Sequence, residues 1–271
     1  MEAQQLQQLH LESDLRHAIE RHELVLYYQP RVDAHSGQLH GVESLIRWQH
    51  PQRGLIAPDS FIPLAEETGL IVAIGAWVIR EACRQHAAWR AAGVGDIGVS
   101  VNLSAIQLKN GSLAATLREV LREFDIAPGR IEFELTESIL MEHVDDTVAT
   151  LQAIKALGFA ISIDDFGTGY SSLAYLKRFP VDRLKIDQSF VRDITDDPDD
   201  AAIVRAVIQL GHSLRLEVIA EGTETPEQMA FLRDEGCSAA QGYLFSPPLP
   251  ADAITELLRV GILPAAPIVP H

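Results

Sequence analysis

Short segments in which apolar and polar residues alternate recur along the chain, and most are followed by a longer segment with helical spacing. The alternation is strictest at 131–136, where Glu132, Glu134 and Thr136 share one face. We expect the first strand to stop at Pro30, because proline lacks the amide hydrogen that a strand ladder uses. The pattern predicts eight β-strands, at 24–29, 39–48, 99–103, 131–136, 159–163, 184–187, 216–221 and 239–243.

Between these strands, apolar residues recur at the spacing of an amphipathic helix. The spacing predicts helices at 2–22, 71–90, 113–124, 139–157 and 251–259, with others after the acidic turn 196–200 and after Thr225. Strands that alternate with helices favour a parallel sheet. Eight such units in about 250 residues predict an α/β fold, a TIM-type (β/α)8 barrel whose active site lies at the C-terminal ends of the strands.

Polar residues with apolar neighbours lie on these strands or at their ends, and they would face one another in the mouth of the barrel. Several buried acids in one place require cations to balance their charge. Their oxygen ligands suit Mg²⁺ or Mn²⁺ better than zinc or copper. The residues are Glu43, Asn102, Glu134, Asp164, Lys185, Glu221 and Gln241.

The stretch 164–173 follows the fifth strand and begins with two adjacent acids, Asp164 and Asp165. Adjacent carboxylates can serve two ions about 4 Å apart, the spacing of two-metal phosphodiester hydrolysis. Gly167 and Gly169 let the backbone turn tightly after them. The alternative is an acidic surface turn in which an aspartate caps the next helix.

Three further residues have a structural and a functional interpretation. Lys185 either pairs with its neighbour Asp187 or orients the attacking water beside the metals, and we favour the second. Arg47 either forms a surface salt bridge or clamps a phosphate, and its place on the face of Glu43 favours the clamp. Glu137 either caps the helix that follows it or anchors the glycine loop after Asp165, and we favour the anchor.

Composition narrows the classes of partner. The 271-residue chain has a net charge of −16, which disfavours a general surface for DNA or RNA. No window approaches the ~20 uninterrupted apolar residues of a membrane span. Cys83 and Cys237 lack metal-ligand spacing, so we expect a reducing, cytoplasmic location and no disulfide.

The chain resembles the EAL-domain cyclic di-GMP phosphodiesterases over nearly its full length. Each motif is weak alone, but together they are specific. They are Gln29-Pro30, Glu43-Ser44-Leu45-Ile46-Arg47, Glu67-Thr68-Gly69-Leu70-Ile71, Val101-Asn102-Leu103-Ser104, Glu134-Leu135-Thr136-Glu137, Asp164 to Ser172, Leu184-Lys185-Ile186-Asp187, Glu221-Gly222-Thr223-Glu224 and Gln241-Gly242-Tyr243.

The resemblance implies a modified barrel whose first strand runs antiparallel to the others. It also implies hydrolysis of cyclic di-GMP to linear pGpG with two ions, Mg²⁺ or Mn²⁺. By similarity, one ion is held by Glu43, Asn102, Glu134 and Asp164, and the second by Asp164 and Asp165. Lys185 and Glu221 would assist the attacking water, Gln241 would lie near it, Gln29 and Arg47 would contact the substrate, and Glu137 would hold the glycine loop.

The same resemblance sets the expected domain organisation. Residues 13–260 would form the EAL phosphodiesterase domain, residues 1–12 a Gln-rich linker that starts the N-terminal helix, and residues 261–271 a loose tail. We expect a sensory or regulatory domain upstream. We also expect a homodimer that uses the surface near the glycine loop and residues 172–178.

Two departures from the family pattern are conservative: Ser44 stands for the usual alanine and Thr223 for the usual valine. Two rival functions stay open. One is a receptor that binds cyclic di-GMP without useful turnover, although receptors of this kind usually lose acids that this chain keeps. The other is an enolase-type barrel lyase, which also groups acids around Mg²⁺, although the Asp164-Asp165 pair and Arg47 favour the hydrolase.

Overall fold

The structure, a computed structural model, describes residues 2–127, 129–141, 144–169 and 173–260. Eight strands close into a barrel in the order β1-β2-β4-β5-β6-β7-β8-β9 and back to β1. Their bounds are β1 (Leu24–Asp33), β2 (Leu39–His50), β4 (Gly98–Asn102), β5 (Ile131–Thr136), β6 (Ala160–Phe166), β7 (Arg183–Ile186), β8 (Glu217–Ala220) and β9 (Ala239–Gln241).

Strand β1 runs antiparallel to both of its barrel neighbours, β2 and β9, while the other seven strands run parallel to one another. A tight turn makes β1 and β2 a hairpin: Asp33 Oδ1 accepts the Ser36 amide at 2.7 Å, and Gly37 takes φ +69°. The expected modified barrel with an antiparallel first strand is therefore confirmed.

Pro30 does not end the first strand, contrary to the prediction, since β1 continues to Asp33. The reason lies in the partners of β1. One edge pairs with the short strand β10 (Leu249–Pro250) up to Tyr28 and with β9 from Arg31 onward. Pro30 falls between these two partners, so its missing amide interrupts neither ladder.

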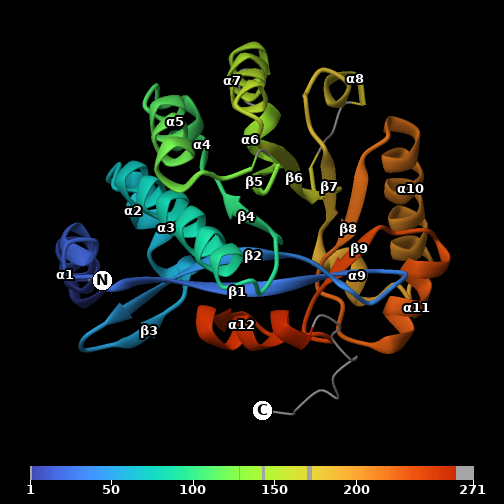
Figure 1. The fold of residues 1–271 in the computed structure, drawn as a ribbon, viewed down its shortest axis with the longest axis horizontal. Helices are drawn as coiled ribbons and strands as arrows, with labels where there is room; N and C mark the ends of the chain where they lie inside the picture. Colours follow the sequence, from blue (N-terminus) through green and yellow to red (C-terminus); the bar gives the residue numbers. More distant parts are fainter. Residues whose placement is uncertain (1, 128, 142–143, 170–172, 261–271) are drawn as a thin grey trace.

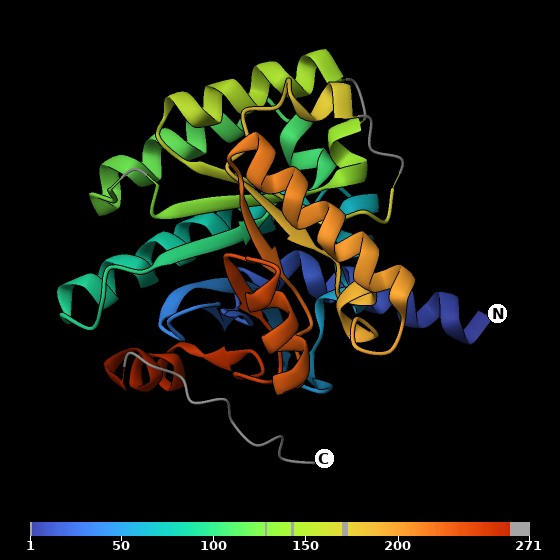
Figure 2. The same cartoon turned by 90° about the vertical axis from the view of Figure 1, so that its right-hand side faces the viewer.

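Helices surround the barrel, and α12 lies beside β1 (Figure 1). Figure 2 shows α1 extending away from the barrel towards its N-terminal end. The helices are α1 (Glu2–Ala18), α2 (Ile62–Glu67), α3 (Ile71–Ala91), α4 (Ala105–Lys109), α5 (Leu113–Phe124), α6 (Glu137–Met141), α7 (Val144–Ala156), α8 (Leu173–Leu176), α9 (Gln188–Arg192), α10 (Pro198–Leu214), α11 (Pro226–Asp234) and α12 (Ala251–Val260).

Several helix boundaries differ from the prediction. The predicted helix over 139–157 corresponds to α6 and α7, which flank residues 142–143 outside the described residues, and α6 begins two residues earlier, at Glu137. Helix α1 ends at Ala18, because the chain turns there and His22 takes a left-handed φ of +55°. The hairpin strand β3 (Gly54–Ile56) and the 3₁₀ turn Pro58–Ser60 were not predicted. The expected tail at 261–271 lies outside the described residues.

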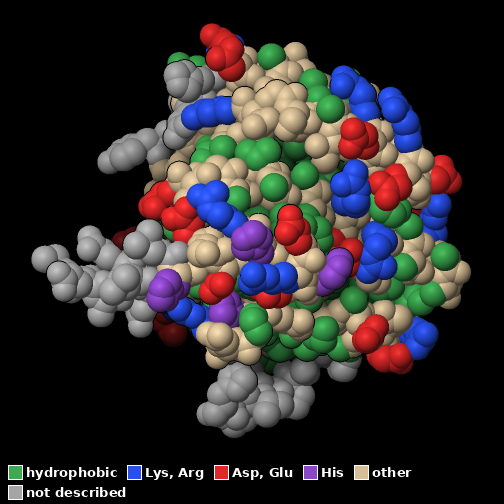
Figure 3. All heavy atoms as spheres, turned by 90° about the vertical axis from the view of Figure 1, so that its left-hand side faces the viewer, with side chains coloured by type: hydrophobic (Ala, Val, Ile, Leu, Met, Phe, Trp, Pro, Cys, Tyr) green, Lys and Arg blue, Asp and Glu red, His purple; other side chains and the backbone are tan. Residues whose placement is uncertain are grey.

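The face on the α1 side carries basic and acidic side chains interspersed with one another (Figure 3). On this side Asp14 forms a hydrogen bond with His50 at 3.2 Å and an ion pair with Arg21 at 3.9 Å. The described part of this face therefore shows no continuous basic stripe of the kind that follows a nucleic-acid backbone. Among the described residues, no helix is long and apolar enough to cross a membrane.

Candidate active site

Lys185, on β7, is the centre of the polar cluster inside the barrel. Its ammonium is fully buried and lies within 4 Å of four carboxylates contributed by four different strands or strand ends. The distances from Nζ are 2.5 Å to Glu134, 2.6 Å to Glu221, 3.1 Å to Asp164 and 3.6 Å to Glu43.

The alternative in which Lys185 pairs with its sequence neighbour Asp187 is not supported. Asp187 does not pair with Lys185 but caps helix α9, where its Oδ1 accepts the Ser189 amide at 2.9 Å. Lys185 and Asp187 are only two residues apart, but Asp187 lies beyond the end of β7, while Lys185 is on the strand and faces the barrel interior. Its partners come from sequence positions 21 to 142 residues away, from Asp164 and back to Glu43.

A chain of amide side chains fixes the orientation of Glu43. Asn102 donates through Nδ2 to Oε1 of Glu43 at 2.7 Å, and Gln241 donates through Nε2 to Oε2 at 2.6 Å. Gln241 Nε2 also lies 3.0 Å from Oε1 of Gln29, whose own amide donates to the Ser246 carbonyl. Four of the predicted site residues are thus joined in one hydrogen-bonded group.

Asp164 and Asp165 lie on the same side of the barrel mouth, although adjacent residues on a regular strand point to opposite faces. The β6–β7 register shifts between Ile163 and Phe166, and Asp165 takes a left-handed φ of +53°. This irregularity brings one oxygen each of Asp164, Asp165 and Glu221 within 4.8 Å of one another. The three carboxylates form a candidate site for a cation.

Glu137 lies behind the glycine loop and is 2% exposed. Its Oε2 accepts the backbone amide of Gly167 at 3.1 Å. A Cβ on Gly169 would approach Oε1 of Glu137 to 2.7 Å, so a larger residue there would displace the carboxylate. The loop-anchor contact is therefore present, and it exists alongside the position of Glu137 as the first residue of α6.

The electrostatics of the cluster show an excess of negative charge. Burial raises the pKa of Glu134 to about 8, helped by the charge of Glu43, and burial with the charge of Asp164 raises the pKa of Asp165 to about 6. Burial also raises the pKa of Glu221 well above its usual range. Burial opposes the charge on Lys185, yet the surrounding acids outweigh it and hold the pKa of Lys185 well above its usual value.

These observations allow a test of the expected ions. One ammonium faces four acids, and the ligands on offer are carboxylates and the Asn102 amide, a hard oxygen set that suits Mg²⁺ or Mn²⁺. Glu134 Oε1 is buried without a hydrogen-bond partner. The residues present fit divalent cations, with Asp164, Asp165 and Glu221 as the tightest carboxylate group.

A cavity of about 370 Å³ opens above this cluster, and its walls include Gln29, Glu43, Asp164, Glu221 and Gln241. Arg47 is not among its lining residues. The Arg47 guanidinium donates to its neighbour's carbonyl on Ile46 and stacks 5.7 Å from the ring centroid of Tyr27. Arg47 therefore lies apart from the centre of the cluster in this structure.

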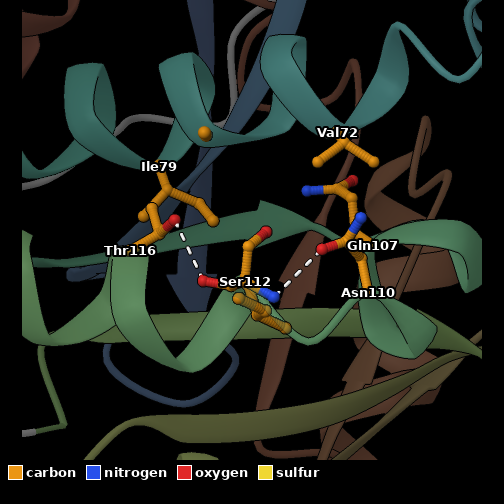
Figure 4. Close-up of a pocket in the computed structure, with 8 residues that line it drawn as sticks. Val72, Ile79, Gln107, Asn110, Ser112 and Thr116 are labelled. Carbon is orange, nitrogen blue, oxygen red and sulfur yellow. Dashed lines mark hydrogen bonds between the residues drawn. The ribbon is translucent and has the colours of Figure 1, made fainter.

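Two other hollows differ in character. An apolar groove of about 500 Å³ lies beside the cavity, and Leu45 lines both. A small pocket of about 10 Å³ between α3, α4 and α5 has room for about one water molecule (Figure 4). Its hydrogen bonds, from the Ser112 amide to Asn110 and from Thr116 to the Ser112 carbonyl, belong to a helix start. None of its lining residues titrates, so it offers no catalytic group.

Sequence reasoning missed Arg31, which lies inside the barrel 2% exposed and contacts Glu132 at 2.9 Å. A signal for it existed: Arg31 follows Gln29 at the strand period of two, on the same face. The signal was lost because the strand was expected to stop at Pro30. Glu132 was expected on the polar face of its strand, but no role was assigned to it.

The EAL domain family matches residues 12–248 of this chain. The chain is 49% identical over 254 residues to the bifunctional diguanylate cyclase/cyclic di-GMP phosphodiesterase MucR of Pseudomonas aeruginosa, covering 94% of this chain and 37% of MucR. It is 45% identical over 245 residues to the cyclic di-GMP phosphodiesterase PdeR of Escherichia coli, covering 90% of this chain and 37% of PdeR.

Among solved structures, the PaMucR phosphodiesterase in complex with c-di-GMP matches with a TM-score of 0.87 and 49% identity, covering 90% of this chain and 99% of that one. The EAL enzyme Bd1971, in a form with cAMP and cyclic di-GMP bound, matches with a TM-score of 0.88 and 36% identity, covering 94% of this chain and 70% of that one.

Proposed function

Because this chain belongs to the EAL domain family, we propose that it hydrolyses one phosphodiester bond of cyclic di-GMP and releases linear pGpG, with two Mg²⁺ or Mn²⁺ ions. The observation that carries the proposal is the convergence of Glu43, Glu134, Asp164 and Glu221 on the buried Lys185. A binding module has no need for so costly a cluster of buried acids.

We assign the ligands from the donor set. Glu43, Asn102, Glu134 and Asp164 would hold one ion, and Asp164 and Asp165 the other, with Glu221 in reach of the Asp pair. When bound, such ions neutralise the phosphoryl oxygens and lower the pKa of a bound water. The bulge at Asp165 supports this assignment, because it turns two neighbouring acids to one side.

Lys185 and Glu221 have complementary roles beside the ions. The Lys185 ammonium lies within 4 Å of four carboxylates, so it would act as a hydrogen-bond donor that orients the attacking water. Glu221 Oε1 lies 2.6 Å from Nζ, so its carboxylate would be placed to accept a proton from that water. Gln241, through its bonds to Glu43 and Gln29, would hold the near wall of the cavity.

The substrate would lie across the two hollows at the mouth. The polar cavity would take the phosphodiester beside Gln29, and the neighbouring apolar groove would take the flat face of a base. Arg47 would contact a phosphate from the rim. For this contact its side chain must leave the Ile46 carbonyl, since the guanidinium is bonded there in the structure.

We also propose further domains, a cytoplasmic location and a homodimer. The chain spans little more than a third of the length of MucR and of PdeR, 37% of each, which supports further domains, including an upstream sensory or regulatory domain. We infer a cytoplasmic location, since both thiols, Cys83 and Cys237, are free and buried. We propose a homodimer through the surface around α8, where Tyr175 and Arg178 are exposed; residues 170–172 of the expected surface lie outside the described residues.

One assay tests the function. Purified protein is incubated with cyclic di-GMP and Mg²⁺ or Mn²⁺, and the products are separated and identified. We expect linear pGpG, and its absence despite measurable cyclic di-GMP binding would identify the chain as a receptor instead. Light scattering with metal and substrate tests the dimer, and a monomer at high protein concentration would refute it.

A further inference from the structure

Arg31 lies directly beneath the candidate metal ligands. Its side chain projects from β1 into the barrel interior and is 2% exposed. Nη2 contacts Oε2 of Glu132 at 2.9 Å, and Nη1 approaches Oε1 of Glu134 to 3.6 Å. Glu132 and Glu134 are two residues apart on β5, so both side chains point inward and one planar guanidinium can face both carboxylates.

The two arginine contacts belong to a column of alternating charge that runs through the barrel. Below Arg31, Glu132 also contacts Arg183 at 3.2 Å, and Arg183 reaches Glu217 near the surface. Above Arg31, Glu134 contacts Lys185 at 2.5 Å. In order, the charge column is Glu217, Arg183, Glu132, Arg31, Glu134 and Lys185.

We propose that Arg31 is a positioning residue for the metal centre: it fixes the carboxylate of Glu134 from below, so that Glu134 presents one defined oxygen to the ion above. This inference rests on the proposed two-metal function. The two oxygens of Glu134 already have separate neighbours, since Oε2 contacts Lys185 and Oε1 faces Arg31. Oε1 lies 3.6 Å from Nη1 and accepts no hydrogen bond, so it keeps its lone pairs for an ion, while the two cations restrict rotation of the carboxylate.

The barrel is shaped to admit this guanidinium. Gly41 on β2 is the cross-strand partner of Arg31, and a Cβ there would lie 3.2 Å from Nη2 and 3.5 Å from Nε. Glycine therefore leaves the space that the guanidinium occupies. Because Glu132 has a second cationic partner in Arg183, neutralising Glu132 does not by itself require Arg31.

The primary test is Arg31→Lys, which keeps the charge but replaces the planar guanidinium, whose Nη1 and Nη2 face different carboxylates, with one ammonium of different shape and reach. Mn²⁺ is titrated into the metal-free protein without substrate, and the dissociation constant is compared with that of the unsubstituted chain. We expect about 10-fold weaker Mn²⁺ binding, the usual effect of losing a partner that orients a metal ligand. We also expect kcat to fall while KM for cyclic di-GMP changes little.

The matched control is Arg183→Lys. Arg183 contacts the same Glu132 one step further from the metal ligands, and Glu134 is not among its ion-pair partners in the described chain. We expect Arg183→Lys to bind Mn²⁺ as the unsubstituted chain does. Equal weakening in both variants would mean that any disturbance of the charge column loosens the barrel, and it would overturn a specific role for Arg31.

A second variant covers the case in which Arg31→Lys does not fold. The double substitution Arg31→Met with Glu132→Gln removes one positive and one negative charge together, so the net charge beneath Glu134 is unchanged and no buried ion is left unpaired. Positioning predicts weaker Mn²⁺ binding here as well. Mn²⁺ binding at the original affinity in this variant would overturn the proposal.

The titration separates this proposal from the proposed function. An unsubstituted chain that binds Mn²⁺ but yields no pGpG would refute the hydrolase and leave the role of Arg31 open to the same comparison. An unsubstituted chain that hydrolyses cyclic di-GMP, with an Arg31→Lys variant that binds Mn²⁺ normally, would refute the role of Arg31 alone.

Discussion

Oε2 of Glu137 lies 3.1 Å from the backbone nitrogen of Gly167 and accepts its hydrogen bond. The contact joins the end of β5 to the loop that follows Asp165. We expect Glu137→Ala to leave the fold intact but lower turnover at least ~10-fold, because a hydrogen bond to a charged group contributes roughly 1.5–3 kcal/mol to holding the loop. Steady-state kinetics and a metal titration measure the effect.

The control for Glu137 is Asp146→Ala, which removes an exposed acid from the first turn of α7. Loss of a favourable charge at a helix start costs about 0.3–1 kcal/mol of stability and should leave turnover unchanged. Normal turnover and metal dependence in Glu137→Ala would show that Glu137 serves only as a helix cap.

Lys185→Ala should reduce turnover at least ~10²-fold while substrate affinity changes little, since in the proposed mechanism the ammonium orients the water and does not bind the bases. Asp164→Asn should be more severe, because Asp164 would serve both ions. Lys155→Ala is the matched control: its ammonium pairs with Asp182 at 2.7 Å in a part-exposed position outside the barrel mouth. Near-normal turnover in Lys185→Ala would show that Lys185 serves only as an ion-pair partner and does not orient the water.

Metal should affect stability as well as rate. Mg²⁺ and Mn²⁺ should support hydrolysis and raise the melting temperature, because an ion that binds only the folded state stabilises it. Ca²⁺ should also raise the melting temperature but support little turnover, since it is larger and less strict in geometry. Equal rates with Ca²⁺ and Mg²⁺ would contradict the two-metal mechanism.

The metal-free protein should be more stable at pH 5 than at pH 8. The pKa values of Glu134, about 8, and Asp165, about 6, are raised by burial and neighbouring acids, so these groups favour folding when protonated. Their contribution is therefore lost as pH rises through about 6 to 8. Thermal melts in chelator test this, and Asp165→Asn should weaken the pH dependence. A melting temperature that rises from pH 5 to pH 8 would contradict it.

Thr223→Val should stabilise the protein. Thr223 is fully buried, and its hydroxyl has no hydrogen-bond partner in the structure. Valine has the same shape, so the exchange removes a desolvation cost of about 1–3 kcal/mol without leaving a cavity. Urea unfolding measures the change, with the exposed Thr195→Val as control. Destabilisation would mean that the hydroxyl has a partner in solution.

The alternation of apolar and polar residues was enough to predict the eight barrel strands and most of the inward polar residues. Period two assigns each residue to a face, and parallel strands carry inward residues to a common mouth. For that reason Glu43, Glu134, Asp164 and Lys185 could be grouped from the sequence alone, and the fold brings them together.

The alternation did not predict the antiparallel direction of β1, which was expected only from the family resemblance. The pattern of a strand reads the same in either direction, and only the pairing with β2 and β9 decides it. Arg31 depended on the same pairing, since Pro30 interrupts a strand only where a partner needs its amide.

The placement of Asp165 was likewise decided only by the tertiary structure. A regular strand would turn Asp165 away from Asp164, and nothing local in the sequence specifies the register shift that brings them together. That shift depends on how β6 meets β7, a contact between segments about 20 residues apart. Sequence periodicity thus determined which residues face the barrel interior, while long-range strand pairing decided which of them touch.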